Sequence, residues 1–101
     1  MDMKKLMAQA QKMQSELQKK MEEFDSKLFD FVYKDLVKLE IYGSLKIKKI
    51  TILDDSLIDK NDKDMLGDVI SQAVNNAVEA LIKGKTEITN KVAGPGLDGL
   101  F

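Results

Sequence analysis

Lysines recur every seven residues near the start of the chain, within KKLMAQAQKMQSELQKKM at residues 4–21. On a helix this spacing gives two neighbouring columns: Lys5, Lys12 and Lys19 in one, and Lys4, Gln11 and Gln18 in the other. The small residues Ala8 and Ser15 lie between the columns. Because an ammonium group is a point charge, such a face suits phosphate better than bidentate contact with base edges. The spacing therefore indicates a surface on which a phosphate backbone could lie close to a helix.

The same face has other interpretations. Solvated lysine-rich helix faces are common, and ion pairs between Lys12 and Glu16 or between Lys19 and Glu23 would stabilise one modestly. The pattern alone also leaves membrane-surface binding and a protein partner open. Membrane binding is disfavoured by the modest apolar face and the absence of tryptophan.

Composition argues against catalysis. The chain of 101 residues has no histidine and no cysteine, and it has neither a Walker loop nor a GxGxxG turn. Its only carboxylate cluster, the aspartates of residues 54–68, lacks the spacing of a calcium loop and suits a solvated loop before a helix. We expect no enzyme activity, no catalytic residue, no metal site, no cofactor and no small-molecule substrate.

Charge is segregated along the chain although the net charge is only −1. Residues 1–20 carry five lysines against two acids, and residues 54–68 carry six aspartates against two lysines. All of the basic residues are lysines. The polar N-terminus and the lack of a long apolar run predict a cytoplasmic protein with no part in the membrane.

Hydrophobic periodicity supplies the elements that position the lysines. A heptad-like seam predicts a helix within residues 1–25: Met3, Leu6, Ala10, Met13, Leu17 and Phe24. Alternation then predicts three antiparallel strands within 27–53, with Gly43-Ser44 as a two-residue hairpin turn and a bulge at Lys48-Lys49. The first two strands could also be one bent strand.

A second long helix is expected at residues 61–92, and its broad apolar face predicts contact with the sheet and with a second surface. Residues 1–93 would form one α+β domain of order α-β-β-β-α, followed by an irregular Gly-rich tail at 94–101. Such a domain has an open sheet edge and an uncovered helix seam. Pairing of two subunits would cover both, so we infer a homodimer.

Four segments, in order, resemble the YbaB/EbfC family of bacterial nucleoid-associated proteins. They are the first helix KKLMAQAQKMQSELQKKMEE, the hairpin region LVKLEIYGSLKIKKITILDDSLI, the helix segment DKDMLGDVISQAVNNAVEAL and the ending GPGLDGLF. The family often has a longer Gly-rich loop between its first two strands, where this chain has only FVYKDLV.

The resemblance implies a tweezer-like homodimer whose first helices project and bind double-stranded DNA, with a role in nucleoid organisation or gene regulation. Carried over to this chain, the DNA-contacting residues would be Lys4, Lys5, Gln11, Lys12, Ser15, Gln18, Lys19 and Lys20. The alternative is a protein-interaction module that docks partner helices through the Met/Leu seam of the first helix.

Overall fold

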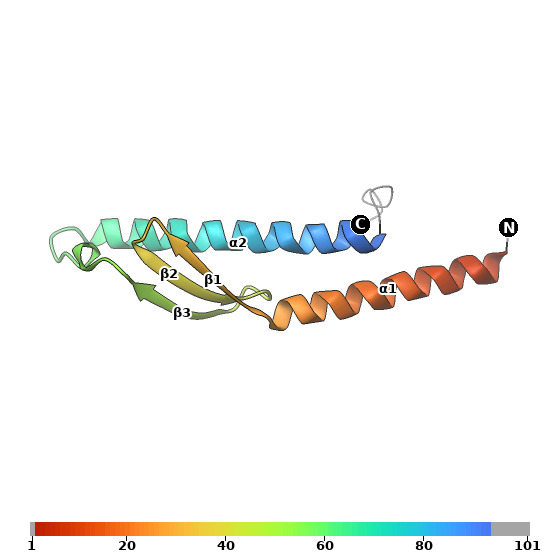
Figure 1. Cartoon of the computed structure of the whole chain (residues 1–101). Coiled ribbons are helices and arrows are strands. Elements are labelled where there is room, and N and C mark those ends of the chain that lie inside the picture. Colours follow the sequence, from red (N-terminus) through yellow and green to blue (C-terminus); the bar gives the residue numbers. More distant parts are fainter. Residues whose placement is uncertain (1, 94–101) are drawn as a thin grey trace.

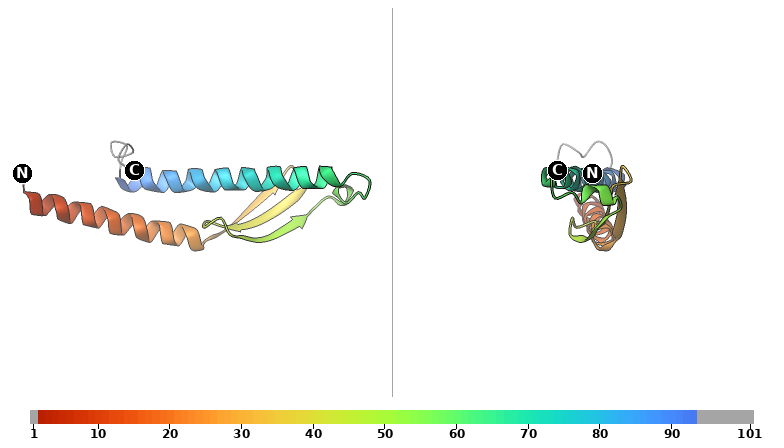
Figure 2. Two further views of the ribbon diagram at one scale, coloured as in Figure 1. Left: turned by 180° about the vertical axis from the view of Figure 1, so that it is seen from behind. Right: turned by 90° about the vertical axis from the view of Figure 1, so that its left-hand side faces the viewer.

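A computed structural model describes residues 2–93 of the chain. The order is α1 (Met3–Ser26), β1 (Leu28–Tyr33), β2 (Val37–Tyr42), β3 (Ile47–Ile52), a short 3₁₀ helix η1 (Asp55–Leu57) and α2 (Lys63–Ala93). This confirms the α+β class and the α-β-β-β-α order. The molecule is elongated, 70 × 23 × 16 Å, because α1 extends away from the sheet and past the end of α2 (Figures 1 and 2).

The three strands form one antiparallel sheet in the order β1-β2-β3. Lys34, Asp35 and Leu36 join the first two, and Lys34 and Asp35 have positive φ, 48° and 57°. The Leu36 N–H donates to the Tyr33 carbonyl at 2.8 Å, which closes a tight turn of the primed type with Lys34 and Asp35 at its centre. The idea of a single bent strand is therefore wrong, because this turn reverses the chain.

The second hairpin contains the predicted bulge. Glu40 pairs with Lys49 and Ile41 pairs with Ile47, so Lys48 is the extra residue. The turn is one residue longer than predicted, since the Leu45 N–H closes on the Tyr42 carbonyl and Leu45 itself has φ 74°. A turn followed by a left-handed residue is the usual three-residue hairpin. The bulge then returns the isoleucines to the inner face of the sheet.

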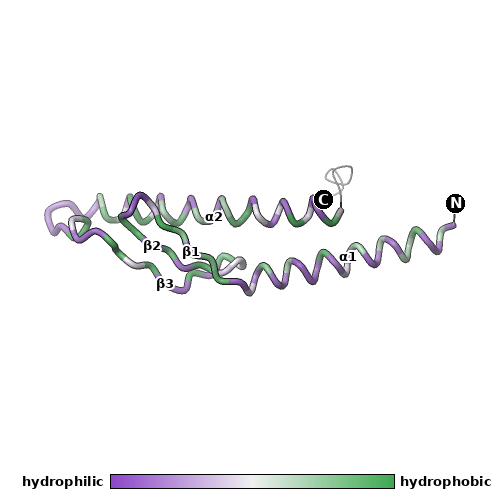
Figure 3. The backbone as a smooth tube through the Cα atoms, viewed as in Figure 1, coloured by the Kyte–Doolittle hydropathy of each residue, from purple (hydrophilic) through white to green (hydrophobic). Residues whose placement is uncertain are grey.

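The core lies between the inner face of the sheet and α2 (Figure 1). Among the described residues, the buried apolar side chains come from β2, η1 and α2: Val37, Leu39, Ile41, Leu57, Ala73, Ala77 and Leu81. The Tyr33 hydroxyl also donates to Gln72, tying the end of β1 to α2. Hydropathy along the backbone follows this arrangement, with apolar residues recurring on α2 and on the strands (Figure 3).

Helix α2 covers the sheet with one column of its broad apolar face. Ala73, Ala77 and Leu81 are buried, whereas the adjacent column ends in Ile82, which is 51% exposed. The helix continues without a break through Gly84. The predicted tail, residues 94–101, lies outside the described residues.

Candidate nucleic-acid interface

The lysine face lies on α1, which begins at a well-formed cap. The Asp2 carboxylate accepts a hydrogen bond from the Lys4 N–H at 3.0 Å, and the Asp2 carbonyl accepts from the Leu6 N–H at 3.2 Å. An aspartate at this position satisfies a free N–H and complements the positive end of the helix dipole. The helix therefore starts firmly at Met3, immediately before the first two lysines.

No residue of α1 is buried. The helix is 24 residues long, which corresponds to about 36 Å at 1.5 Å per residue. Every described residue from Asp2 to Lys12 is exposed, while Met13, Leu17, Met21 and Phe24 are only half-exposed because they face α2. We call α1 the arm, since its first half projects beyond the rest of the described chain (Figure 2).

All eight residues expected to contact DNA lie on this arm, and all are exposed: Lys4, Lys5, Gln11, Lys12, Ser15, Gln18, Lys19 and Lys20. Seven of them lie on the outer face of the helix, whereas Lys20 pairs with Glu16 and lines the space between the arm and α2. Lys5, Lys12 and Lys19 follow one another at about 10.5 Å, which is seven residues of helical rise. This separation is close to the Debye length of about 10 Å at 0.1 M salt, so the three charges act almost independently.

Ion pairing on the arm differs from the pairs that the sequence left possible. Glu16 pairs with Lys20 at 3.4 Å, and Gln18 donates to Glu22 at 3.3 Å. The possible pairs of Lys12 with Glu16 and Lys19 with Glu23 are absent from residues 2–93. Glutamate on the N-terminal side of lysine is the more favourable order along a helix, which explains why Glu16 pairs with Lys20.

The arm is held at its C-terminal end by close contact with the second hairpin. The Gly43 N–H donates to the Lys27 carbonyl at 3.0 Å, and the Ser44 N–H donates to the Asp25 carbonyl at 3.2 Å. A Cβ atom at Gly43 would lie only 2.0 Å from the Phe24 carbonyl oxygen. Gly43 is therefore needed to let the hairpin approach the backbone of the arm, a role that its place in a turn sequence did not reveal.

Phe24 and Asp25 attach the same end of the arm to α2. The Phe24 ring packs against Phe29, with centroids 5.0 Å apart, and approaches to within 3.0 Å of where a Cβ of Gly84 would lie. Asp25 Oδ1, which accepts no hydrogen bond from the described residues, has the Lys85 ammonium 3.1 Å away. Together, Phe24, Asp25, Gly43 and Lys85 form what we call the arm root.

The acidic segment at the opposite end of the molecule caps helices. Asp54 accepts from the Ser56 N–H at 2.9 Å, and Asp62 accepts from the Met65 N–H at 3.2 Å at the start of α2. Hydrogen bonds from the Ser56 hydroxyl and backbone N–H hold the pKa of Asp54 below its ordinary value. Within the part of the chain that the structure describes, no cluster of acidic side chains is arranged to hold a metal ion.

None of the described helices combines the length and the apolar character needed to cross a membrane. The two charged regions of the sequence lie far apart in the fold. The lysines follow the arm, and the aspartates lie at the opposite end of the molecule, between β3 and the start of α2 (Figure 1).

Comparison with known proteins gives a match over nearly the whole chain. Residues 1–97 match the model of the YbaB/EbfC DNA-binding family. A nucleoid-associated protein of Malacoplasma penetrans is 40% identical over 89 residues, covering 88% of this chain and 94% of that protein. One from Ureaplasma parvum is 40% identical over 101 residues, covering both chains completely. A third, from Francisella philomiragia, is 44% identical over 79 residues, covering 77% of this chain and 69% of that protein.

Proposed function

Because this chain belongs to the YbaB/EbfC DNA-binding family, we propose that it binds double-stranded DNA mainly through the lysines of α1. The supporting observation is the combination of exposure and charge on the arm. Lys4, Lys5, Lys12 and Lys19 are exposed, and no carboxylate of residues 2–93 pairs with them. Their ammonium groups are free to replace counterions along a phosphate backbone, which supplies most of the free energy of nonspecific DNA binding.

The arm's neutral residues complete the proposed contact strip. Gln11, Ser15 and Gln18 are exposed beside the lysine columns, and their side chains can donate hydrogen bonds to phosphate oxygens. Such contacts position a protein on DNA without reading the bases. The proposed binding is therefore largely independent of sequence, with no catalytic step, no cofactor and no small-molecule substrate.

We further propose that the working form is a homodimer with two arms. A compact chain of this length has a radius of gyration of about 13 Å, whereas this one has 19.3 Å. Large apolar side chains remain uncovered outside the arm, among them Val32 at 55% and Ile82 at 51% exposure. A second copy would bury such surface and add to a thin core, and it would present a second lysine strip to the same duplex.

The cellular role that fits these properties is organisation of the nucleoid or regulation of genes, carried out at the nucleoid in the cytoplasm. Electrostatic contacts of low sequence preference allow a small protein to occupy many sites. The three similar proteins described above are each named nucleoid-associated, which supports this role.

Titration of the purified protein onto a labelled duplex of arbitrary sequence tests the proposal. Anisotropy should report binding at about 50 mM salt, with affinity falling roughly 10³-fold or more by about 200 mM if six or more phosphates are contacted. Absence of binding at the lower salt concentration would refute DNA binding.

One observation favours a second candidate, a module that docks partner helices. The apolar seam at the tip of the arm is uncovered, with Met3 71%, Leu6 43% and Met7 60% exposed. Methionine-rich surfaces adapt to many apolar partners. In that case Leu6→Glu would abolish capture of a partner protein after nuclease treatment, while lysine substitutions on the arm would leave capture unchanged.

A further inference from the structure

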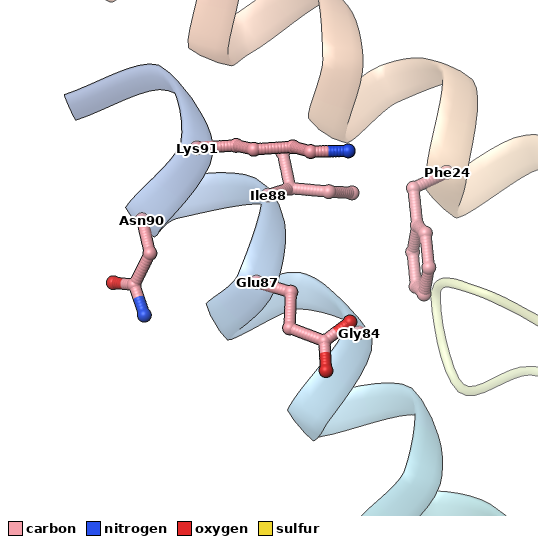
Figure 4. Close-up of a pocket in the computed structure, with 6 residues that line it drawn as sticks. All are labelled: Phe24, Gly84, Glu87, Ile88, Asn90 and Lys91. Carbon is pink, nitrogen blue, oxygen red and sulfur yellow. The ribbon is translucent and has the colours of Figure 1, made fainter. Parts of the chain in front are cut away.

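The arm and the sheet pack against the same side of α2. Ala73, Ala77 and Leu81 of α2 are buried in the clusters that also contain residues of β2. Ile88 follows Leu81 by two helical turns, on the same stripe of α2, and faces the Phe24 ring of the arm (Figure 4). The inner face of the sheet and the seam of the arm therefore both point toward this side of α2. Their opposite faces both point away from it (Figure 1).

Three exposed lysines lie on the outer face of the sheet, which points away from α2: Lys46, Lys48 and Lys49, which we call the hairpin lysines. The Tyr42 N–H donates to the Lys46 carbonyl at 2.9 Å, and Lys49 pairs with Glu40. Glu40 and Tyr42 alternate with the buried residues of β2 and so point outward, as do their cross-strand partners. A regular strand would turn one of two consecutive lysines toward the core, whereas the bulge at Lys48 lets both face solvent.

The hairpin lysines have no acidic partner in the described chain. Neither ion pair found among residues 2–93 involves them, although Glu40 lies directly across from Lys49. Asp30 is the neighbour of Glu40 on β1, and Lys38 is on the same face of β2. This face of the sheet thus carries four lysines against two acids. Unpaired ammonium groups on an exposed face suit phosphate groups, whose counterions they replace on binding.

The hairpin lysines adjoin the arm at the arm root. The Ser44 N–H donates to the Asp25 carbonyl at 3.2 Å, so the turn of the hairpin touches the arm. Lys46 is two residues from Ser44, which is about 7 Å of extended chain. Lys19 is six residues from Asp25, which is about 9 Å of helical rise. The arm lysines and the hairpin lysines are thus about 20 Å apart along the backbone, or roughly six base pairs of B-DNA at about 3.4 Å each.

We propose that the hairpin lysines bind the phosphate backbone of the same duplex that the arm binds. They add a second contact beyond the C-terminal end of the arm, on the side of the molecule that carries the arm lysines. This inference rests on the proposed DNA binding by the arm. Continuity with the arm and the excess of positive charge favour DNA over a protein as the occupant. The uncovered Val32 lies on β1, at the other edge of the sheet, so a dimer that buries Val32 need not cover the hairpin lysines.

Acetylation of lysines, quantified residue by residue with mass spectrometry, tests this contact without any substitution. When a duplex is added at about 50 mM salt, the hairpin lysines should lose reactivity several-fold, together with the outer lysines of the arm. Three exposed control lysines outside both groups should keep their reactivity: Lys34, Lys60 and Lys63. Protection of the arm alone would overturn the inference and leave the proposed function standing. Protection of neither group would overturn both.

A charge-removing variant provides a second readout. Lys46→Gln, Lys48→Gln and Lys49→Gln together remove three charges but keep long side chains on the strand. The plot of log affinity against log salt should become shallower by about 0.9 for each lost contact, or up to about 2.7 per chain. The matched variant, with glutamine at the three control lysines, should keep the wild-type slope. A wild-type slope in the hairpin variant would overturn the inference. An equal change in both variants would also overturn it, because the effect would then be one of net charge.

Discussion

One methyl group added at Gly43 should destabilise the arm root more than one added at any other position there. A Cβ there would lie 2.0 Å from the Phe24 oxygen, 2.7 Å from the Phe24 carbonyl carbon and 2.7 Å from its ring. Two of these atoms belong to the backbone of α1, so the clash is relieved only by moving the arm away from the hairpin. That movement also weakens the hydrogen bonds that Gly43 and Ser44 donate to the arm.

The magnitude follows from these two effects. Overpacking costs about 1–3 kcal/mol, and each weakened hydrogen bond costs about 1 kcal/mol, so Gly43→Ala should lower the free energy of unfolding by about 3–5 kcal/mol. Gly67→Ala is the matched control, because a Cβ at Gly67 meets nothing within 4 Å. Gly67 lies inside α2, one turn after its start, where that change should raise the free energy of unfolding by up to about 1 kcal/mol.

Urea unfolding followed by circular dichroism measures both variants, at one protein concentration because dimerisation would contribute to stability. The midpoint of Gly43→Ala should fall well below that of the wild type, and the midpoint of Gly67→Ala should equal or exceed it. If the two variants unfold at the same urea concentration, the inferred contact between hairpin and arm is wrong.

Two further predictions concern single interactions. Lys85→Ala should lower the free energy of unfolding by no more than about 1 kcal/mol, since the pair of Lys85 with Asp25 is partly exposed. The loss should still exceed that of the control Lys83→Ala, which removes an exposed lysine. Urea unfolding compares the two variants, and equal values would show that the pair contributes nothing. Ser56→Ala should raise the pKa of Asp54 toward its ordinary 3.8, as measured by carbon NMR of the carboxyl group. Because the pKa of Asp54 is lower in the folded than in the unfolded chain, its hydrogen bonds with Ser56 stabilise the fold above the unfolded pKa. This stabilisation is lost as the pH falls through the folded pKa. An unchanged titration of Asp54 in the variant would refute the role of the Ser56 hydroxyl.

Local patterns were sufficient to predict the elements of the fold. Alternation of apolar residues in β2 matches the buried side chains Val37, Leu39 and Ile41. The slip of that alternation in β3 marked the bulge now found at Lys48. Both features depend on short-range periodicity, which a single sequence displays directly.

Contacts between distant segments could not be predicted in the same way. Gly43 lies in the predicted turn, yet it is Leu45 that adopts positive φ, and Gly43 also provides space for Phe24. Likewise, nothing in the sequence pairs Asp25 with Lys85, which is sixty residues away. Periodicity identifies which side chains face inward but not which ones meet.

For the candidate interface, the sequence predicted which residues are exposed on the arm better than it predicted which of them form ion pairs. All eight expected contact residues are exposed on the arm, seven of them on its outer face and Lys20 on the side toward α2. The pairs that the sequence left possible, Lys12 with Glu16 and Lys19 with Glu23, do not form among residues 2–93. Glu16 pairs with Lys20 instead, in the more favourable order of charges.

The salt dependence of DNA binding by an arm variant shows most directly whether the lysines of α1 bind DNA. Replacing Lys5, Lys12 and Lys19 with alanine should weaken binding to every duplex and should make the plot of log affinity against log salt shallower. The expected change is about 0.9 per lost phosphate contact, or roughly 2.7 if one arm binds and roughly 5.4 if two do. The control replaces Lys34, Lys60 and Lys63, which are exposed and lie away from the arm, and so removes the same charge. The control should keep the wild-type slope and the arm variant should show a shallower one; equal slopes for the two variants would refute binding through the arm lysines.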